Sequence, residues 1–144
     1  MSTNLKLLKQ QAYVAGQWIE ANSGERFAVN NPATGELLAE VPNLGAEETR
    51  AAIQKANDAW PAWRNKTSKE RAAILRRWFD LQVEHQEELA QLMTAEQGKP
   101  LAEARGEVLY AASFVEWFAE EAKRIYGDII LGPVNDHRLL VIKQ

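Results

Sequence analysis

Cysteine is absent from the 144-residue chain, and this absence excludes more chemistry than any other feature of the composition. A chain without thiols forms no disulfide, no thiolate zinc site and no cysteine nucleophile. Histidine is scarce as well: His85 and His137 are the only two, and they lie far apart without the spacing of a metal site. We therefore predict a solvated or helix-capping role for each histidine.

Positive charge in excess and long apolar runs are also lacking. The 17 Lys and Arg residues against 20 Asp and Glu residues give a net charge of −3, so no basic surface indicates nucleic-acid binding. No stretch approaches the roughly 18 consecutive apolar residues of a membrane span, and the N-terminus lacks an apolar signal core. We expect a cytoplasmic protein with neither a nucleic-acid nor a membrane partner.

Glycine motifs that hold phosphate groups are missing too. Neither G-x-G-x-x-G nor the Walker pattern occurs, and Gly24, Gly35, Gly45 and Gly98 are isolated residues of predicted turns or helix ends. The residues that are present, 46% hydrophobic and 26% charged, have the balance of an ordinary globular domain. The composition thus predicts a packed core and no nucleotide site made by these residues alone.

Small antiparallel β-structure is predicted in residues 11–42, after a polar lead-in of residues 1–10 that we expect to be flexible. The first hairpin turns at Ala15–Gly16, where Gly16 takes a positive φ. The second has strands at residues 26–30 and 36–41, joined by the turn at residues 31–35.

Four successive helices are predicted in residues 46–126. The first has two carboxylates in its opening turn, and we expect Pro61 to end it. The second opens with the capping-box spacing of Thr67 and Glu70, and a break near His85 separates it from the third. Large rings contribute much buried area, so Trp60, Trp63 and Trp78 are assigned to the core and to the seams between helices.

The longest helix is predicted between Gly98 and Gly127, at about 25 residues, with Lys123 and Arg124 in its last turn. Its apolar residues recur at helical spacing: Leu101, Ala104, Val108, Ala111, Ala112, Val115, Phe118, Ala119, Ala122 and Ile125. We expect the side carrying Val108, Val115 and Phe118 to lie against a sheet that these residues do not encode.

Aromatic and charged side chains on this helix allow two interpretations each. Tyr110 and Phe114 share a face by their i,i+4 spacing, and they either pack in the core or line a substrate passage. The carboxylates of residues 116, 120 and 121 beside Lys123 and Arg124 are either exposed charge pairs or an acid/base cluster. Exposed charge pairs are the simpler interpretation.

An apolar β-run follows at residues 138–143. No strand follows it that could pair with it, so the run predicts an open apolar edge and a chain that is cut short. We expect the isolated chain to oligomerise or aggregate through this edge.

Several motifs together resemble the start of the aldehyde dehydrogenase superfamily. They are Tyr13-Val14-Ala15-Gly16-Gln17-Trp18, Asn31 to Glu36, Trp63-Arg64, Arg71 to Leu75, Glu96 to Leu101 and Tyr126-Gly127. The similarity covers residues 11–144, and the run 112–128 looks most like the bacterial succinate-semialdehyde dehydrogenases.

The resemblance implies an α/β fold in which the hairpins and four helices are incomplete without a downstream Rossmann-like sheet. Residues 11–128 would be the N-terminal part of the NAD(P)-binding domain, and residues 129–144 the start of a bridging β-arm that builds homo-oligomers. The complete protein would oxidise succinate semialdehyde, a small aldehyde, to succinate with NADP or NAD. Its cysteine nucleophile, its glutamate base and its cofactor contacts would lie beyond Gln144, so the 144-residue chain itself would be inert.

The resemblance also assigns four residues of this chain. Tyr110 and Phe114 match the helix that borders the family's aldehyde entrance, and Glu96 with the backbone carbonyl of Val29 matches a monovalent-cation site. Glu96 has the alternative of a last-turn carboxylate that is hydrogen-bonded locally. A free-standing helical module that binds a protein through its aromatic face is the alternative function.

Overall fold

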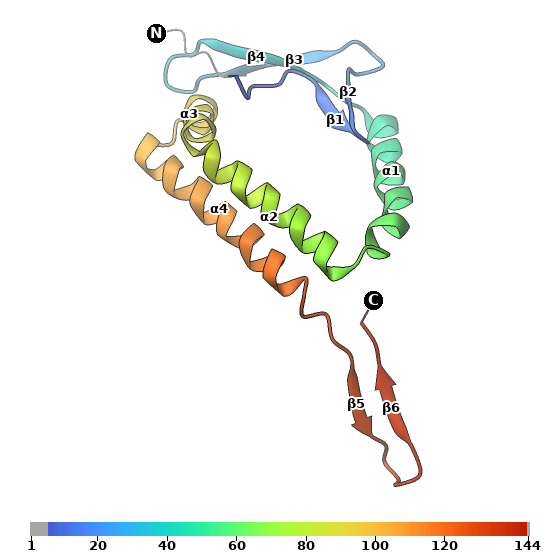
Figure 1. Ribbon diagram of the computed structural model, residues 1–144. Coiled ribbons are helices and arrows are strands. Elements are labelled where there is room, and N and C mark those ends of the chain that lie inside the picture. The colour runs from blue at the N-terminus through green and yellow to red at the C-terminus, as the bar shows by residue number, and fades with distance from the viewer. Residues whose placement is uncertain (1–5, 144) are drawn as a thin grey trace.

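The computed structural model describes residues 6–143, in which three β-hairpins flank a run of four helices (Figure 1). The elements are β1 (Ala12–Val14), β2 (Gln17–Ile19), β3 (Arg26–Asn30), β4 (Leu37–Pro42), α1 (Ala46–Arg64), α2 (Ser68–Glu84), α3 (Gln86–Gln97), α4 (Leu101–Glu121), β5 (Asp128–Leu131) and β6 (Arg138–Val141). The predicted hairpins followed by four helices are confirmed. α2, α3 and α4 pack together, whereas α1 stands apart and β5–β6 projects away from the helices.

Residues 1–5 of the expected flexible lead-in lie outside the described residues. The part that is described makes hydrogen bonds to the folded body. The Leu7 N–H donates to Glu88 Oε1 at 2.6 Å, and the Gln10 carbonyl accepts from Arg26 Nη2 at 2.9 Å. This segment therefore joins α3 to the second hairpin.

The two N-terminal hairpins form where the turn residues predict them. Ala15 and Gly16 both have positive φ, at 50° and 82°, as a two-residue turn between right-twisted strands requires. Gly35, with φ of 76°, closes the second turn, where Asn31 Oδ1 accepts the Ala33 N–H at 2.9 Å. The predicted positive φ of Gly16 is confirmed, and Ala15 takes the same conformation.

Helix α1 runs through Pro61 and ends at Arg64, so the prediction that Pro61 ends it was wrong. Proline removes a single N–H from the hydrogen-bond ladder, and its fixed φ suits a helix. The helix continues because the Asn65 N–H donates to the Pro61 carbonyl at 3.2 Å. At the other end, Glu48 accepts the N–H of Gly45 at 3.0 Å and that of Asn22 at 3.0 Å, which fastens α1 to the first hairpin.

Helix α2 opens with the predicted capping box. The Thr67 N–H donates to Glu70 Oε2 at 2.7 Å, and the Glu70 N–H donates to Thr67 Oγ1 at 3.3 Å. The Thr67 hydroxyl and N–H lower the pKa of Glu70 because both donate to its carboxylate. His85 occupies the junction of α2 and α3, but its side chain makes no capping hydrogen bond at the start of α3, and Gly98 ends α3 with φ of 76°.

Helix α4 ends at Glu121 and is shorter than predicted, since Gly127 lies outside it. After Glu121 the backbone forms tighter turns, with hydrogen bonds to the carbonyl three residues back. The Lys123 N–H donates to the Glu120 carbonyl, and the Arg124 N–H donates to the Glu121 carbonyl. Lys123 and Arg124 therefore follow the helix rather than forming its last turn.

The core is a seam of small residues along α4. Its buried members there are Ala104, Val108, Ala112 and Ala119, and Ala90 of α3 joins Ala104 and Val108 in one cluster. Val108 thus packs inside this chain, which corrects its assignment to an absent sheet. Phe118 is 58% exposed.

The tryptophans assigned to the core and the helix seams are not buried. Trp60 is 49% exposed and Trp78 is 53% exposed, whereas Trp63 is half-buried. Helix α1, all of whose residues are described, buries none of them. Spacing placed these rings on apolar faces correctly, but no other described element covers those faces.

The apolar run at residues 138–143 is paired, so the prediction of an unpaired strand was wrong. β6 pairs antiparallel with β5, from Asp128 opposite Val141 to Leu131 opposite Arg138. The partner lies upstream, across the turn at residues 132–136, whereas only a downstream partner had been sought. Every residue of both strands is exposed, so the hairpin keeps two uncovered apolar faces and free outer edges.

We predict that Gly127→Ala loosens the β5–β6 hairpin at its base. A Cβ at Gly127 would overlap the carbonyl oxygen of Val141, so one strand has to move. Hydrogen exchange of the β5–β6 amides should become faster by about tenfold or more, equivalent to a local cost of roughly 1–3 kcal/mol.

Gly106→Ala is the matched control. Gly106 lies inside α4 with open space around its Cβ position. Alanine should stabilise the helix there by roughly 0.5–1 kcal/mol, seen as a higher thermal midpoint. Equal exchange rates in Gly127→Ala and the unmodified chain would show that the hairpin tolerates the added methyl group.

Candidate functional site

The outer aromatic face of α4, formed by Tyr110, Phe114, Trp117 and Phe118, is the candidate site. Three- and four-residue spacing places these rings on the side of the helix opposite the buried seam. The two predicted substrate residues come together, because the rings of Tyr110 and Phe114 meet edge to face with centroids 4.9 Å apart. Tyr110 is 67% exposed and Phe114 48%, so this pair lies on the surface.

A surface hollow adjoins this pair toward the C-terminal end of α4. It is lined by Ser113, Phe114, Glu116, Trp117, Phe118, Glu120, Glu121 and Arg124. Phe114 is therefore both a partner of Tyr110 and a wall of the hollow. The lining combines aromatic rings with charged side chains, and small-molecule sites are likewise mostly apolar with a few polar groups.

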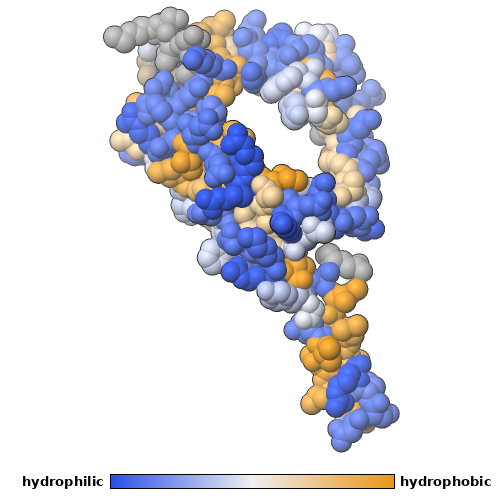
Figure 2. Space-filling view, viewed as in Figure 1, coloured by the Kyte–Doolittle hydropathy of each residue, from blue (hydrophilic) through white to orange (hydrophobic). Residues whose placement is uncertain are grey.

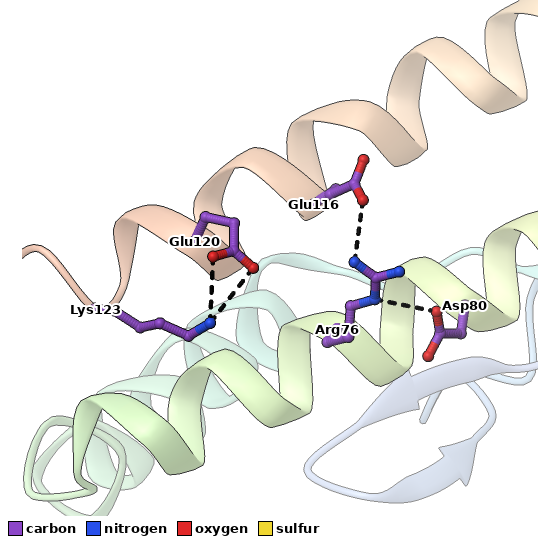
Figure 3. Close-up of polar contacts among 5 residues, drawn as sticks. All are labelled: Arg76, Asp80, Glu116, Glu120 and Lys123. Atoms are coloured by element: carbon purple, nitrogen blue, oxygen red, sulfur yellow. Dashed lines mark hydrogen bonds and ion pairs between the residues drawn. The ribbon is translucent and has the colours of Figure 1, made fainter.

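The charged residues beside the hollow are paired with cations (Figure 3). Arg76 of α2 donates through Nη1 to Glu116 at 3.0 Å and through Nε to Asp80 at 3.3 Å. Lys123 donates to both carboxylate oxygens of Glu120, at 3.2 and 3.4 Å. Glu121 accepts from Arg124 at 2.6 Å.

The interpretation as exposed charge pairs is thus confirmed for Glu120 and Glu121. Glu116 differs, because its partner Arg76 lies on another helix, 40 positions away in the sequence. That contact ties α4 to α2 across the surface. Each carboxylate of the group has a cation beside it.

A second ionic contact, missed by sequence reasoning, joins α3 to α4. Arg105 donates through Nε to Glu87 Oε2 at 2.6 Å and through Nη2 to Oε1 at 2.9 Å, and Gln91 Nε2 donates to the same carboxylate at 2.9 Å. The guanidinium is the main reason that the pKa of Glu87 falls from its usual 4.5 to about 2. Glu87 and Arg105 lie 18 positions apart in the sequence, so no local spacing of residues predicts their contact.

The two residues assigned to a cation site lie in elements that approach each other. A Cβ at Gly98, at the end of α3, would come within 3.2 Å of Pro32 in the turn after β3. Glu96 is exposed in the last turn of α3, and the β3–β4 register shifts directly after Val29. Residues 6–143 contain no group of three or more Asp, Glu, His or Cys side chains that could hold a metal ion.

Within the described part of the chain, no helix combines the length and the apolar character needed to cross a bilayer.

Comparison with known proteins decides the family. The model of the aldehyde dehydrogenase family matches residues 18–144. This chain belongs to the aldehyde dehydrogenase family. The resemblance stated from the sequence motifs is thereby confirmed.

Two bacterial relatives of this aldehyde dehydrogenase chain are equally similar to it. It is 64% identical over 139 residues to the glutarate-semialdehyde dehydrogenase of Pseudomonas aeruginosa, covering 96% of this chain and 29% of that protein. It is 64% identical over 138 residues to the NADP(+) succinate-semialdehyde dehydrogenase GabD of Escherichia coli, again covering 96% and 29%. The chain thus spans about 29% of the length of these relatives.

Solved structures show the same relation. The crystal structure of an E. coli NADP-dependent enzyme superposes with a TM-score of 0.94 at 63% identity, covering 99% of this chain and 30% of that one. The succinate-semialdehyde dehydrogenase of Burkholderia pseudomallei gives 0.90 at 56%, covering 94% and 28%. The hairpins and helices described above are therefore those of the N-terminal part of this fold.

We predict that Glu87→Gln destabilises the chain at neutral pH and has no further effect at low pH. A carboxylate with a lowered folded-state pKa adds stability above its unfolded value of 4.5, and this contribution disappears as the pH falls from there through about 2. The thermal midpoints of Glu87→Gln and the unmodified chain should therefore differ at pH 7 and converge toward pH 2.

Glu103→Gln is the control, because it removes an exposed carboxylate from the first turn of α4. Its midpoint should show no comparable convergence between pH 4.5 and pH 2. A constant difference between Glu87→Gln and the unmodified chain across this range would contradict the ion-pair explanation.

Proposed function

We propose that this chain is the N-terminal part of an aldehyde dehydrogenase that oxidises succinate semialdehyde to succinate with NADP or NAD. The supporting observation is its 64% identity, over nearly its whole length, to relatives named for two semialdehydes. Succinate and glutarate semialdehyde share an aldehyde at one end and a carboxylate at the other. A short aldehyde of this class is the proposed substrate of the complete protein.

The contribution of the described residues is to shape the path of the aldehyde. We assign Tyr110 and Phe114 to the border of this path, because their edge-to-face pair is exposed and adjoins the hollow along α4. Aromatic edges and faces exclude water from one side of a passage without binding the aldehyde tightly. In this assignment the two rings position substrate and take no part in bond making.

The nicotinamide cofactor accepts hydride in this chemistry, and the described residues do not fit it by themselves. Their glycines with positive φ, at positions 16, 24, 35 and 98, stand alone in turns and at a helix end instead of forming a phosphate-binding loop. The proposal therefore assigns the cofactor contacts and the catalytic groups to residues beyond Gln144. In this proposal the 144-residue chain alone is inactive.

The domain assignment and assembly belong to the same proposal. Residues 11–128 form part of the NAD(P)-binding domain, and residues 129–144 begin a bridging arm that joins subunits of a homo-oligomer. The support is the way β5–β6 projects from the helical body with all its residues exposed. A cytoplasmic location completes the proposal.

A free-standing protein-interaction module is not favoured. Its basis was the aromatic face of α4, but the family match covers residues 18–144 and leaves out only the start of the chain. An exposed aromatic face is equally expected of part of a larger enzyme.

The proposed function is tested by joining residues 1–144 to the remainder of the E. coli enzyme, in place of its own N-terminal part. We expect this chimera to reduce NADP in the presence of succinate semialdehyde, measured by NADPH absorbance, with glutarate semialdehyde as the competing substrate. The 144-residue chain alone should be inactive. An inactive but folded chimera would contradict the proposal.

Tyr110→Ala and Phe114→Ala in the chimera test the substrate path. Each should lower kcat/KM by about tenfold, mainly through KM, since a pocket contact of this size is worth roughly 1–3 kcal/mol. Tyr13→Ala is the matched control, because Tyr13 also belongs to an exposed aromatic pair, with Trp18 at 4.9 Å, on the N-terminal hairpin. Equal losses in all three variants would refute a specific role for α4.

We also propose that Glu96 and the Val29 carbonyl bind a monovalent cation at the junction of α3 and the turn after β3. One carboxylate and a carbonyl suit a singly charged hard ion better than a divalent ion, which gathers several carboxylates. Replacing tetramethylammonium by potassium at constant ionic strength should raise the thermal midpoint of the chimera. Glu96→Gln should remove this response, whereas Glu103→Gln should keep it.

A further inference from the structure

A second hollow lies where the end of α1, the start of α2 and the residues after β6 meet (Figure 1). Its volume of about 750 Å³ is within the range of small-molecule sites. Figure 2 shows hydrophilic residues at this junction of the helices, in contrast to the hydrophobic residues that cover much of the β5–β6 hairpin. The lining combines two indole rings with three cations: Trp60, Trp63, Arg64, Arg71 and Lys143.

The positive charge of this hollow has no carboxylate beside it. Among the described residues, no Asp or Glu lines the hollow or forms an ion pair with Arg64, Arg71 or Lys143. Glu70, the neighbour of Arg71 in the sequence, instead accepts the N–H and the hydroxyl of Thr67 at 2.7 and 2.8 Å. A hollow lined by charge of one sign concentrates ions of the opposite sign, so this one attracts anions.

Arg71 is held in position by the backbone of the α1–α2 turn. Its Nη1 donates to the Arg64 carbonyl at 3.3 Å and to the Lys66 carbonyl at 2.5 Å. These contacts leave Nε and Nη2 of the guanidinium, for which residues 6–143 supply no acceptor, and this fork matches the geometry of a carboxylate. Closing the carbonyls of the turn accounts for the position of Arg71, but it does not account for two further cations at the same hollow.

The two indole rings indicate that the anion has a carbon body. Trp60 is half-exposed and Trp63 half-buried, so both rings offer apolar surface at the hollow. Inorganic phosphate has no apolar part to place against such rings. A dicarboxylate has methylene groups between two charged ends and therefore fits both the rings and the cations.

We propose that this hollow binds a small dicarboxylate. One carboxylate is held by the Arg71 guanidinium, the other by Arg64 and Lys143, and the methylene groups lie against the two indole rings. The hollow shares no residue with the one along α4, so the dicarboxylate site lies apart from the outer aromatic face. This inference does not depend on the proposed function.

The test is titration of the 144-residue chain with succinate at constant ionic strength, followed by tryptophan fluorescence and by calorimetry. We expect a saturable signal in both measurements. Butyrate, with a single carboxylate, should bind more weakly, and the uncharged succinamide should not bind. Absence of saturation at millimolar succinate would overturn the proposal, and inorganic phosphate that binds as tightly as succinate would overturn the assignment to an organic dianion.

Charge removal at the rim tests the cations without disturbing the turn that Arg71 closes. Arg64→Gln and Lys143→Gln should each weaken succinate binding by about fivefold, as for an exposed charge contact of the stronger kind. Lys55→Gln is the matched control, because it removes the same charge from an exposed position of α1 outside the hollow and should leave binding unchanged. Equal losses in all three variants would show that net charge alone attracts succinate. Circular dichroism of each variant checks that the helices still form.

The indole rings provide a test of location. The double variant Trp60→Phe/Trp63→Phe should lose the fluorescence response, whereas Trp117→Phe on the outer aromatic face should keep it. A fluorescence response that persists in the double variant would place the dicarboxylate elsewhere on the chain and overturn the proposal.

Discussion

Close contact along the small-residue seam of α4 is the interaction on which the rest of this structure depends. Alanines at positions 104, 112 and 119 allow α2 and α3 to pack tightly against α4, since the distance between helices is set by the side chains between them. The bidentate contact of Glu87 with Arg105 and the contact of Arg76 with Glu116 hold the two edges of this packing. The two N-terminal hairpins are then attached through the ends of α1 and α3.

The same seam explains why α4 has a second apolar face. Small residues on one side leave the large rings of Tyr110, Phe114 and Trp117 on the other, where no described element covers them. A helix with apolar residues on opposite sides is typical of the interior of a larger protein. The surface that bears the candidate site is therefore a consequence of how α4 is divided between two neighbours.

Membership of the aldehyde dehydrogenase family is consistent with the two apolar faces of α4. The chain corresponds to less than a third of its relatives and superposes closely on that part of an intact enzyme. Its own residues build a helical scaffold with an exposed aromatic face on α4. A single helix, α4, thus carries both the packed seam of the scaffold and the exposed aromatic face.

Features that depend on neighbouring residues were determined by the sequence itself. The capping box of Thr67 and Glu70, the positive φ of Gly16 and Gly98 and the succession of four helices each follow from residues within a few positions of one another. The motifs of the family were equally readable, because they are strings of adjacent residues.

Only the tertiary structure decided which apolar faces are covered and which distant residues meet. Spacing shows that a helix has an apolar face but not what packs on it, so Val108 was buried and Trp78 exposed against expectation. The contact of Glu87 with Arg105 and the pairing of β5 with β6 also required the chain to fold back on itself. Such contacts depend on the approach of elements in space, which no local pattern of residues specifies.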